Sequence, residues 1–295
     1  MKKTFFFLVS ILTVLSACQK ETINNIKPSA DNVRAVTSQS PIVMVDTIKR
    51  YDPNFGSVFL TYYYRTSFNY NGRLLNSSTS EVMKQRSGEG LPSITNYFYY
   101  DDNQHLTSTS INLSKYGPSE PEDITSAAVT YSGSHIASIE FIRHDEVSDK
   151  KFLLTYVNDQ LTEIFEPNTV KITYEYDVNG NNTKEINQRY INGATYGAAV
   201  VTNKTAFDDK PGIQNQVPLW DYFKCFDIEM NKPDVGINFS ILQKSFTNTP
   251  GAHNPLAIYI DGTSSVFTYK YLENGYAFQN CDLEYIWRYS YTTLQ

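Results

Sequence analysis

The residues best suited to bind a metal lie in the stretch Asp177-Val178-Asn179-Gly180-Asn181. Oxygen ligands beside a glycine are typical of calcium loops, but an EF-hand loop also needs several further carboxylates, a glycine at its sixth place and a glutamate at its twelfth. The stretch lacks them. Asp-x-Asn-Gly predicts a hairpin turn instead, because Asp and Asn side chains bond to the nearby backbone and Gly takes a positive φ. We therefore expect a turn here, and no metal or other cofactor.

Two further groupings of ionisable residues are candidates for chemistry. His144-Asp145-Glu146 puts an imidazole beside two carboxylates, but neighbours in a strand point to opposite faces and chelate one ion poorly. The pairs Glu163 with Glu166 and Asp282 with Glu284 could supply the acid and base of a glycosidase. Alternating acidic residues on a solvated sheet face explain them better. We predict no catalytic residue, and an envelope hydrolase that uses dispersed carboxylates is the alternative.

Aromatic side chains are the feature with the widest functional reach. They make up 14% of the chain, and 23 of them are Tyr. Tyr and Trp rings stack on sugar rings, but they also fill sheet faces through cross-strand pairs. We assign most of them a structural role. We predict ligand binding for two groups, one in a short helical segment and one on the last strand, namely Trp220, Tyr222, Phe223, Tyr285, Trp287 and Tyr289.

The charge balance excludes one class of partner. The chain holds 25 Lys and Arg against 31 Asp and Glu, for a net charge of −6, and its basic residues do not cluster. A nucleic-acid partner requires a concentrated basic face that neutralises phosphates. We therefore expect no nucleic acid among the partners.

The N-terminus predicts export and lipidation. Lys2 and Lys3 precede the apolar run at residues 4–15, which is shorter than the roughly 20 residues that span a bilayer. Leu15-Ser16-Ala17-Cys18 matches the bacterial lipobox, in which the Cys is lipidated and becomes the first mature residue. The sequence therefore predicts a lipoprotein signal peptide at residues 1–18. Its partner would be the outer membrane, held through acyl chains on Cys18.

The remaining chain divides into a tether and a domain. Residues 19–40 are polar and without periodicity, which predicts a flexible tether. Residues 41–295 are assigned to a single β domain. Its two cysteines, Cys225 and Cys281, are open to two interpretations, a disulfide in an oxidising compartment or two buried thiols.

A hairpin unit recurs along residues 41–295. Each copy has an aromatic-x-Tyr strand, a turn rich in Asn, Asp and Gly, and a polar-aliphatic return strand. The clearest turns are Asn71-Gly72, Asp101-Asp102-Asn103, Ser132-Gly133-Ser134, Asn158-Asp159, Asp177 to Asn182 and Glu273-Asn274-Gly275. Consecutive hairpins with short turns predict an all-β fold, an antiparallel hairpin meander that forms a curved sheet or open barrel. Residues 212–251 break the pattern, and the apolar spacing within them predicts one short helical insertion.

These motifs resemble a known family. Tyr174-Glu175-Tyr176-Asp177 and Tyr269-Lys270-Tyr271 with their following turns look like YD-type hairpin repeats. Phe207-Asp208-Asp209-Lys210-Pro211 and His253-Asn254-Pro255-Leu256 are similar to landmarks of a Bacteroidota lipoprotein family of unknown function. The resemblance covers about residues 58–295, and the chain departs from the family's pattern at Gly212. It implies a porin-like, many-stranded β fold and an envelope location, and it implies no activity.

Taken together, the sequence predicts a cell-envelope lipoprotein that is anchored to the outer membrane on its periplasmic or outer side. The most suitable role is a non-enzymatic binding or scaffold protein, with a glycan or another envelope protein as partner. A hydrolase and a purely structural surface protein are the alternatives.

Overall fold

Alternating burial along each strand shows how the sequence builds the sheet. The computed structural model describes residues 42–51, 62–82, 93–114, 124–144, 151–191, 195–217, 219–230, 251–260, 263–281 and 286–294. In β4, Ser93–Tyr100, the side chains of Ile94, Asn96 and Phe98 are buried, whereas Tyr97 and Tyr99 are exposed. This period of two is what a strand with one solvated face requires.

The described residues form 18 strands, one α-helix and one short 3₁₀ helix. In chain order they are β1 Ile42–Tyr51, β2 Tyr62–Asn71, β3 Leu74–Val82, β4 Ser93–Tyr100, β5 Leu106–Ser114, β6 Ile124–Ser132, β7 His135–Arg143, β8 Phe152–Val157, β9 Gln160–Glu166, β10 Val170–Tyr176, β11 Asn182–Ile191, β12 Thr195–Tyr196, β13 Val200–Pro211, η1 Ile213–Gln216, α2 Trp220–Met230, β14 His253–Ile260, β15 Thr263–Val266, β16 Thr268–Tyr271, β17 Ala277–Cys281 and β18 Ile286–Leu294.

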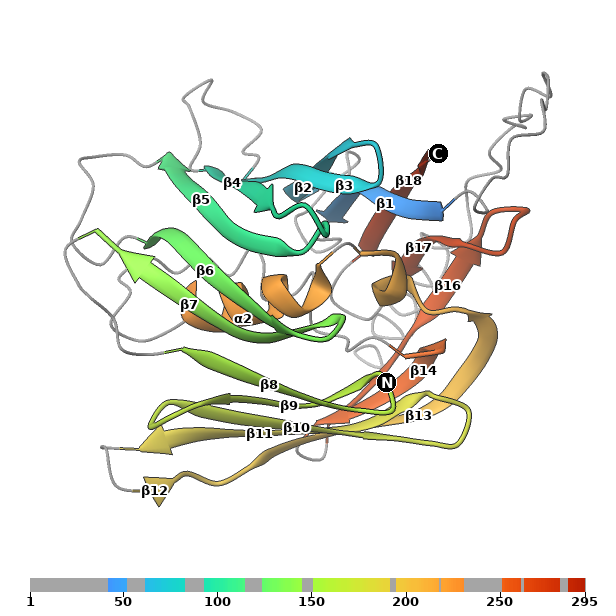
Figure 1. The fold of residues 1–295 in the computed structure, drawn as a ribbon. Helices are drawn as coiled ribbons and strands as arrows, with labels where there is room; N and C mark the ends of the chain where they lie inside the picture. The colour runs from blue at the N-terminus through green and yellow to red at the C-terminus, as the bar shows by residue number, and fades with distance from the viewer. Residues whose placement is uncertain are drawn as a thin grey trace, which may run out of the picture. The chain divides into compact units, whose positions relative to one another are not determined.

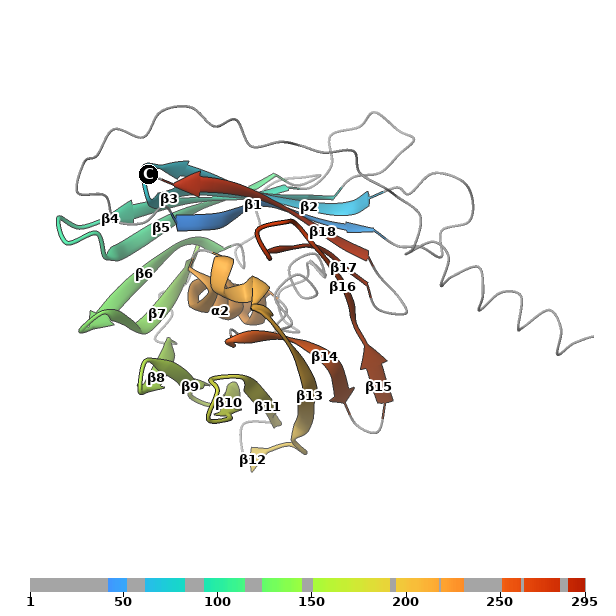
Figure 2. The same cartoon turned by 90° about the vertical axis from the view of Figure 1, so that its right-hand side faces the viewer.

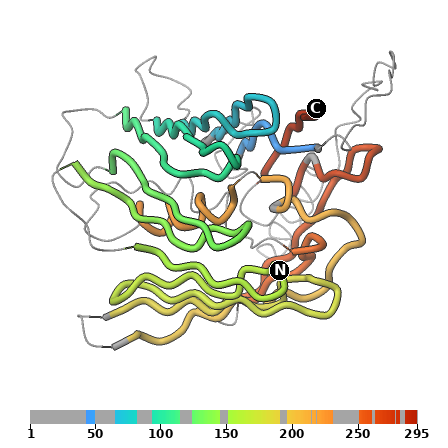
Figure 3. Tube along the Cα trace, in the orientation of Figure 1, coloured from blue at the N-terminus to red at the C-terminus, as the bar shows by residue number. Residues whose placement is uncertain are grey.

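The strands pair antiparallel, each mostly with its neighbours in the chain (Figures 1 and 3). β13 pairs with β11 on one side and with β14 on the other. β15 and β16 are separated only by Phe267. The last strand, β18, pairs with the first, β1, from Ile42 opposite Leu294 to Tyr51 opposite Ile286. The sheet therefore curls into a nearly closed barrel, and the predicted all-β hairpin meander is confirmed.

The turns follow the predicted chemistry. Asn158 and Asp159 have φ values of 52° and 62°, as a two-residue type I′ turn requires. Asp177 Oδ1 accepts hydrogen bonds from the backbone N–H groups of Asn179 and Asn181, at 2.9 and 2.8 Å, and its Oδ2 accepts from the Asn181 side chain at 2.9 Å. The Asp177 carboxylate thus organises the hairpin turn through bonds within the turn.

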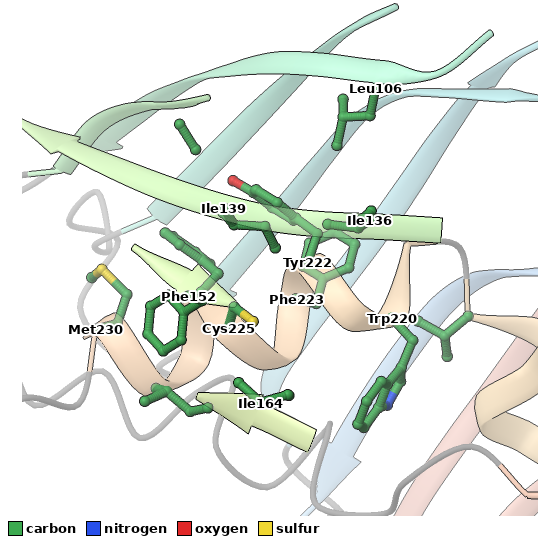
Figure 4. Close-up of a cluster of buried hydrophobic side chains, with 14 of the residues drawn as sticks. Leu106, Ile136, Ile139, Phe152, Ile164, Trp220, Tyr222, Phe223, Cys225 and Met230 are labelled. Carbon is green, nitrogen blue, oxygen red and sulfur yellow. The ribbon is translucent and has the colours of Figure 1, made fainter. Parts of the chain in front are cut away.

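The predicted helical insertion is α2, which lies inside the curved sheet (Figure 2). Its aromatic residues fill the interior. The Phe223 ring packs edge-on against Phe68 and Phe98, with centroids 5.7 and 5.8 Å apart, and the Tyr222 hydroxyl donates to Asn96 Oδ1 at 3.1 Å. Figure 4 shows Tyr222 and Phe223 among the side chains that close this core. α2 therefore fills the interior of the sheet, and the strands curve around it.

The insertion leaves and re-enters the sheet at one point, which we call the neck. The Gly212 N–H donates to the Ala252 carbonyl at 3.1 Å, and any side chain at Gly212 would collide with the Gly251 carbonyl. Asn254 is buried and joins the two sides, since its Nδ2 donates to Asp208 Oδ2 and to the Pro211 carbonyl, both at 3.1 Å. Asn254 Oδ1 also accepts from the Ile213 N–H at 2.9 Å.

Cys225 and Cys281 are both buried thiols that form no disulfide. Cys225 lies on α2 and Cys281 ends β17. Of the two interpretations left open by the sequence, the structure has the pair of buried thiols. Within the described ranges, no helix has the length and apolar character needed to span a membrane. The predicted signal peptide, its Cys18 and the tether at residues 19–40 lie outside the described residues.

Candidate functional site

A tyrosine near the end of the first strand of a hairpin ties neighbouring hairpins together. In four hairpins the hydroxyl of this tyrosine bonds to a backbone carbonyl of an earlier strand. The pairs are Tyr70 with Val45, Tyr100 with Leu75, Tyr131 with Leu106 and Tyr176 with Leu161. These bonds satisfy half-buried hydroxyls and hold adjacent hairpins in register.

Tyr156 breaks this pattern. Like Tyr131, which stacks on His105 with centroids 4.4 Å apart, it stacks on the histidine of the preceding hairpin, His135, also at 4.4 Å. Tyr131 bonds to the carbonyl of Leu106, the residue after its histidine. Tyr156 instead donates to Asp221 Oδ2, at the start of α2, at 2.5 Å. Tyr156 therefore bonds to a carboxylate where these four tyrosines bond to the backbone, and Tyr271 at the end of β16 does the same with Asp208 Oδ2.

The Tyr156–Asp221 pair lies in a cavity of about 560 Å³, which we call the Tyr156 pocket. Its walls are the β6–β7 and β8–β9 turns, the start of α2, η1 and the chain around the neck. A volume of this size falls within the range of small-molecule sites, roughly 300–1,000 Å³. The aromatic and polar lining residues are Tyr131, Tyr156, Tyr176, Trp220, Ser134, His135, Asp159, Gln160, Asn215 and Asp221.

The pocket contains two carboxylates in different settings. The Asp159 side chain is 91% exposed, and its Oδ1 lies 2.9 Å from His135 Nε2. Burial raises the pKa of Asp221, while the hydrogen bond from Tyr156 and the nearby His135 lower it. Burial and the charge of Asp221 raise the pKa of Tyr156 well above its usual value, so that this phenol keeps its proton and donates.

The entry into α2 carries two unusual features. Trp220 is 4% exposed, and its Nε1 is buried without a hydrogen-bond partner among the described residues. Leu219 has a φ of 50°, a left-handed conformation that costs a branched residue about 1–3 kcal/mol. Both residues line the Tyr156 pocket. Strained backbone and unsatisfied buried donors concentrate at ligand sites, because the surrounding structure must hold them in place.

The aromatic residues singled out from the sequence do not come together at one surface. Trp220 lines the pocket, but Tyr222 and Phe223 are at most 1% exposed and their rings contact the interior of the sheet. Trp287 and Tyr289 are also buried, on β18, where the Tyr289 hydroxyl bonds to Asn280 Oδ1 at 3.0 Å. Tyr285 lies outside the described residues. Of the five members of this group that the structure describes, Trp220 alone belongs to the candidate site.

Among the acidic residues weighed from the sequence, the two that the structure describes, Glu163 and Glu166, do not line the Tyr156 pocket. Glu163 pairs with Lys171 at 2.9 Å, and Glu166 is buried. Asp282, Glu284, Asp145 and Glu146 fall outside the described residues, and His144 is exposed. Throughout the ranges that the structure covers, no three His, Cys, Asp or Glu side chains gather in a way that could hold a metal ion.

Sequence reasoning missed His135, Tyr156, Asp159 and Asp221. A signal for the first two was available in the repeats, because His105 and His135 both directly precede the first aliphatic residue of a return strand. That placement recurs in consecutive hairpins and positions each imidazole against the next tyrosine. Asp221 carried no comparable signal, since an acidic residue in the first turn of a helix is ordinary dipole chemistry.

Comparison of the structure with solved structures identifies the architecture. The crystal structure of a porin-like protein from Bacteroides uniformis matches with a TM-score of 0.51 and 13% identity, over 84% of this chain and 96% of that chain. The chain has a porin-like fold. A second porin-like protein, from Bacteroides vulgatus, matches with a TM-score of 0.29 and 10% identity, over 84% of this chain and 98% of that chain. The observed sheet and the match to the Bacteroides uniformis protein confirm the many-stranded fold that the family resemblance implies. No family model matches the sequence, and no curated protein matches it.

Proposed function

We propose that the protein is a lipoprotein of the bacterial cell envelope that binds a glycan in the Tyr156 pocket without transforming it. The observation that carries the proposal is the lining of that pocket, where aromatic rings stand beside carboxylate, amide and imidazole groups. Aromatic rings offer apolar faces to the C–H surfaces of sugars. Carboxylates accept, and amides both donate and accept, the hydrogen bonds that hydroxyl groups make.

The envelope location is supported by two independent observations. Lys2, Lys3, the short apolar run and the Leu15-Ser16-Ala17-Cys18 lipobox predict export and lipidation. The similar fold of a porin-like protein from Bacteroides uniformis points to the same compartment. An acyl anchor on Cys18 followed by the polar residues 19–40 would leave the domain free to meet an extended polymer.

A binding screen tests the proposal. The full protein, extracted from membranes in detergent, is applied to a glycan array and to affinity gels that contain polysaccharides. We expect retention on at least one glycan class. Because the Asp159 side chain is 91% exposed, D159N should change the pocket without disturbing the fold. It and Q160A should weaken binding about tenfold, which corresponds to about 1.4 kcal/mol.

The matched control is D102N. Asp102 is exposed in the equivalent turn between β4 and β5 and does not line the pocket, so its replacement should leave glycan binding unchanged. Binding by none of the glycans, or equal weakening by D102N and D159N, would contradict the proposal.

A hydrolase is the second candidate, because Asp159 and Asp221 line the same cavity and glycosidases use two carboxylates. This candidate predicts that glycans bound by the protein are cleaved over time. Release of reducing ends by the wild type, and its loss in D221N, would establish the hydrolase and overturn the non-enzymatic role. Recovery of the bound glycan intact would contradict the hydrolase.

A further inference from the structure

The charges around the Tyr156 pocket are one-sided. Asp159 and Asp221 line it, and none of its described lining residues is Lys or Arg. One basic side chain beside a lining residue is Lys224, whose Nζ lies 5.9 Å from the centroid of the Trp220 ring. That ammonium is already engaged, 3.4 Å from Glu185 Oε1. An anionic ligand such as a uronic acid or a sulfated sugar would enter this cavity without a positive partner.

We propose that the ligand of the Tyr156 pocket carries a positively charged amine, as an amino sugar with a free amino group does. The proposal rests on the proposed glycan-binding function and specifies which glycans the site prefers. Its central residue is Asp221, because the carboxylate of Asp159 is already bonded to His135.

Asp221 has the free bonding capacity that such a ligand needs. A carboxylate offers about four acceptor positions, and the Tyr156 hydroxyl occupies one of them, on Oδ2. Among the described residues no basic side chain forms an ion pair with Asp221. An ammonium group could donate to Asp221 and replace the hydration that the carboxylate loses on burial.

Two positive features of the site oppose this charge, and neither outweighs it. The start of α2 contributes the equivalent of about half a positive charge, against a full negative charge on Asp221. The imidazole of His135 lies against the Asp159 carboxylate, with Nε2 2.9 Å from Oδ1, so this carboxylate offsets it. The net charge at the start of α2 is therefore negative.

The aromatic residues strengthen the same preference. Tyr156 is hydrogen-bonded to Asp221, and Trp220 lines the same pocket. Rings of this kind attract cations through their π faces by about 0.5–2 kcal/mol, and Trp most strongly.

The experiment compares three oligosaccharides of matched length by calorimetry on the full protein in detergent. They are oligomers of glucosamine, of N-acetylglucosamine and of galacturonic acid, at a pH where the free amine is protonated. We expect the glucosamine oligomer to bind at least about tenfold more tightly than its N-acetylated counterpart, and the galacturonate oligomer to bind more weakly than both. Raised salt should reduce this preference.

D221N separates the inference from the function on which it rests. Asn keeps an acceptor for Tyr156 but removes the charge, so the affinity ratio between the amine and the N-acetylated oligomer should fall toward one. A melting curve like that of the wild type confirms that the variant is folded, and D159N tests whether the exposed carboxylate contributes. Equal binding of the amine and the N-acetylated oligomer, or a ratio that D221N leaves unchanged, overturns the inference and leaves glycan binding intact. Binding of none of the three sugars, with none retained in the array screen, removes the proposed function as well.

Discussion

The hydroxyl of Tyr156 donates to Asp221 Oδ2 at 2.5 Å, whereas the hydroxyl of Tyr176, two strands further along the sheet, donates to the Leu161 carbonyl at 2.9 Å. The two tyrosines hold equivalent places in successive hairpins. Tyr176 therefore holds neighbouring strands together, whereas Tyr156 holds a carboxylate inside a cavity.

Removal of the two hydroxyls should therefore have unequal effects on stability. Y156F leaves a largely desolvated carboxylate without its donor, and we expect a loss of about 2–3 kcal/mol, as for hydrogen bonds to charged groups. Y176F is the control and should cost about 1 kcal/mol. Urea unfolding at neutral pH measures both. Equal losses of unfolding free energy in Y156F and Y176F would show that groups other than the Tyr156 hydroxyl stabilise the Asp221 carboxylate.

Asp221 should make stability depend on pH in a definite direction. Burial raises its pKa above the ordinary value of 3.8, so folding favours the neutral form of this carboxyl relative to the unfolded chain. The wild type should therefore be as stable as D221N below pH 3.8 and should lose stability relative to D221N as the pH rises through the folded-state pKa. Unfolding free energies of both proteins between pH 3 and pH 7 test this. A stability difference that is constant over this range would contradict it.

Lys204 should show the opposite trend at alkaline pH. It is fully buried, and burial lowers its pKa from 10.5 to about 8, although its Nζ donates to Asn182 Oδ1 at 2.5 Å. The unfolded chain binds a proton between these two values and the folded protein does not. The wild type should accordingly gain about 3 kcal/mol relative to K204M as the pH rises from 8 to 10.5.

Chemical unfolding at a series of pH values measures this gain. K184M is the control, because Lys184 lies near the surface and pairs with Glu175. It removes the same charge from the neighbouring strand. A gain of the same size in the K184M comparison would mean that net charge, rather than the burial of Lys204, causes the effect.

The stability of the protein should depend strongly on one side chain of the neck, Asn254. N254A removes the amide that bonds Asp208, Pro211 and Ile213, and it leaves several of these groups unsatisfied in a buried place. We expect a loss of at least about 2 kcal/mol in urea unfolding. N69A, at an exposed site on β2, should change stability by no more than about 0.5 kcal/mol. If N254A is equally mild, the insertion is held by α2 alone.

The hairpins and the helix could be predicted because their signals are local. The residue types in turns such as Asn71-Gly72 and Asn158-Asp159 determine the turn geometry. The apolar spacing of the Trp220 segment predicts a helix. Whether that helix covers the sheet or fills it is not a local property. It depends on closure of the sheet, and this is why Tyr222 and Phe223 are buried although their sequence also suits a ligand surface.

The candidate site could not be predicted from the sequence for the same reason. Tyr156 and Asp221 are 65 residues apart, and nothing in either segment encodes the other. The motifs Phe207-Asp208-Asp209-Lys210-Pro211 and His253-Asn254-Pro255-Leu256 were visible only as landmarks of a family. The structure supplies their physical reason, because Asp208 and Asn254 bond to each other across the neck.

The pairing of β1 with β18 sets the order of events when the protein folds. Each hairpin can form as soon as its own residues are available, but Ile42 can pair only with Leu294, which lies 252 residues further along the chain. Such a distant contact is slow to form because most of the chain must be organised first. Until β18 has paired with β1, the edge of β1 that does not pair with β2 is exposed to other chains. A newly synthesised molecule therefore depends on β18 for protection from aggregation, and loss of β18 should be more harmful during folding than loss of any single hairpin.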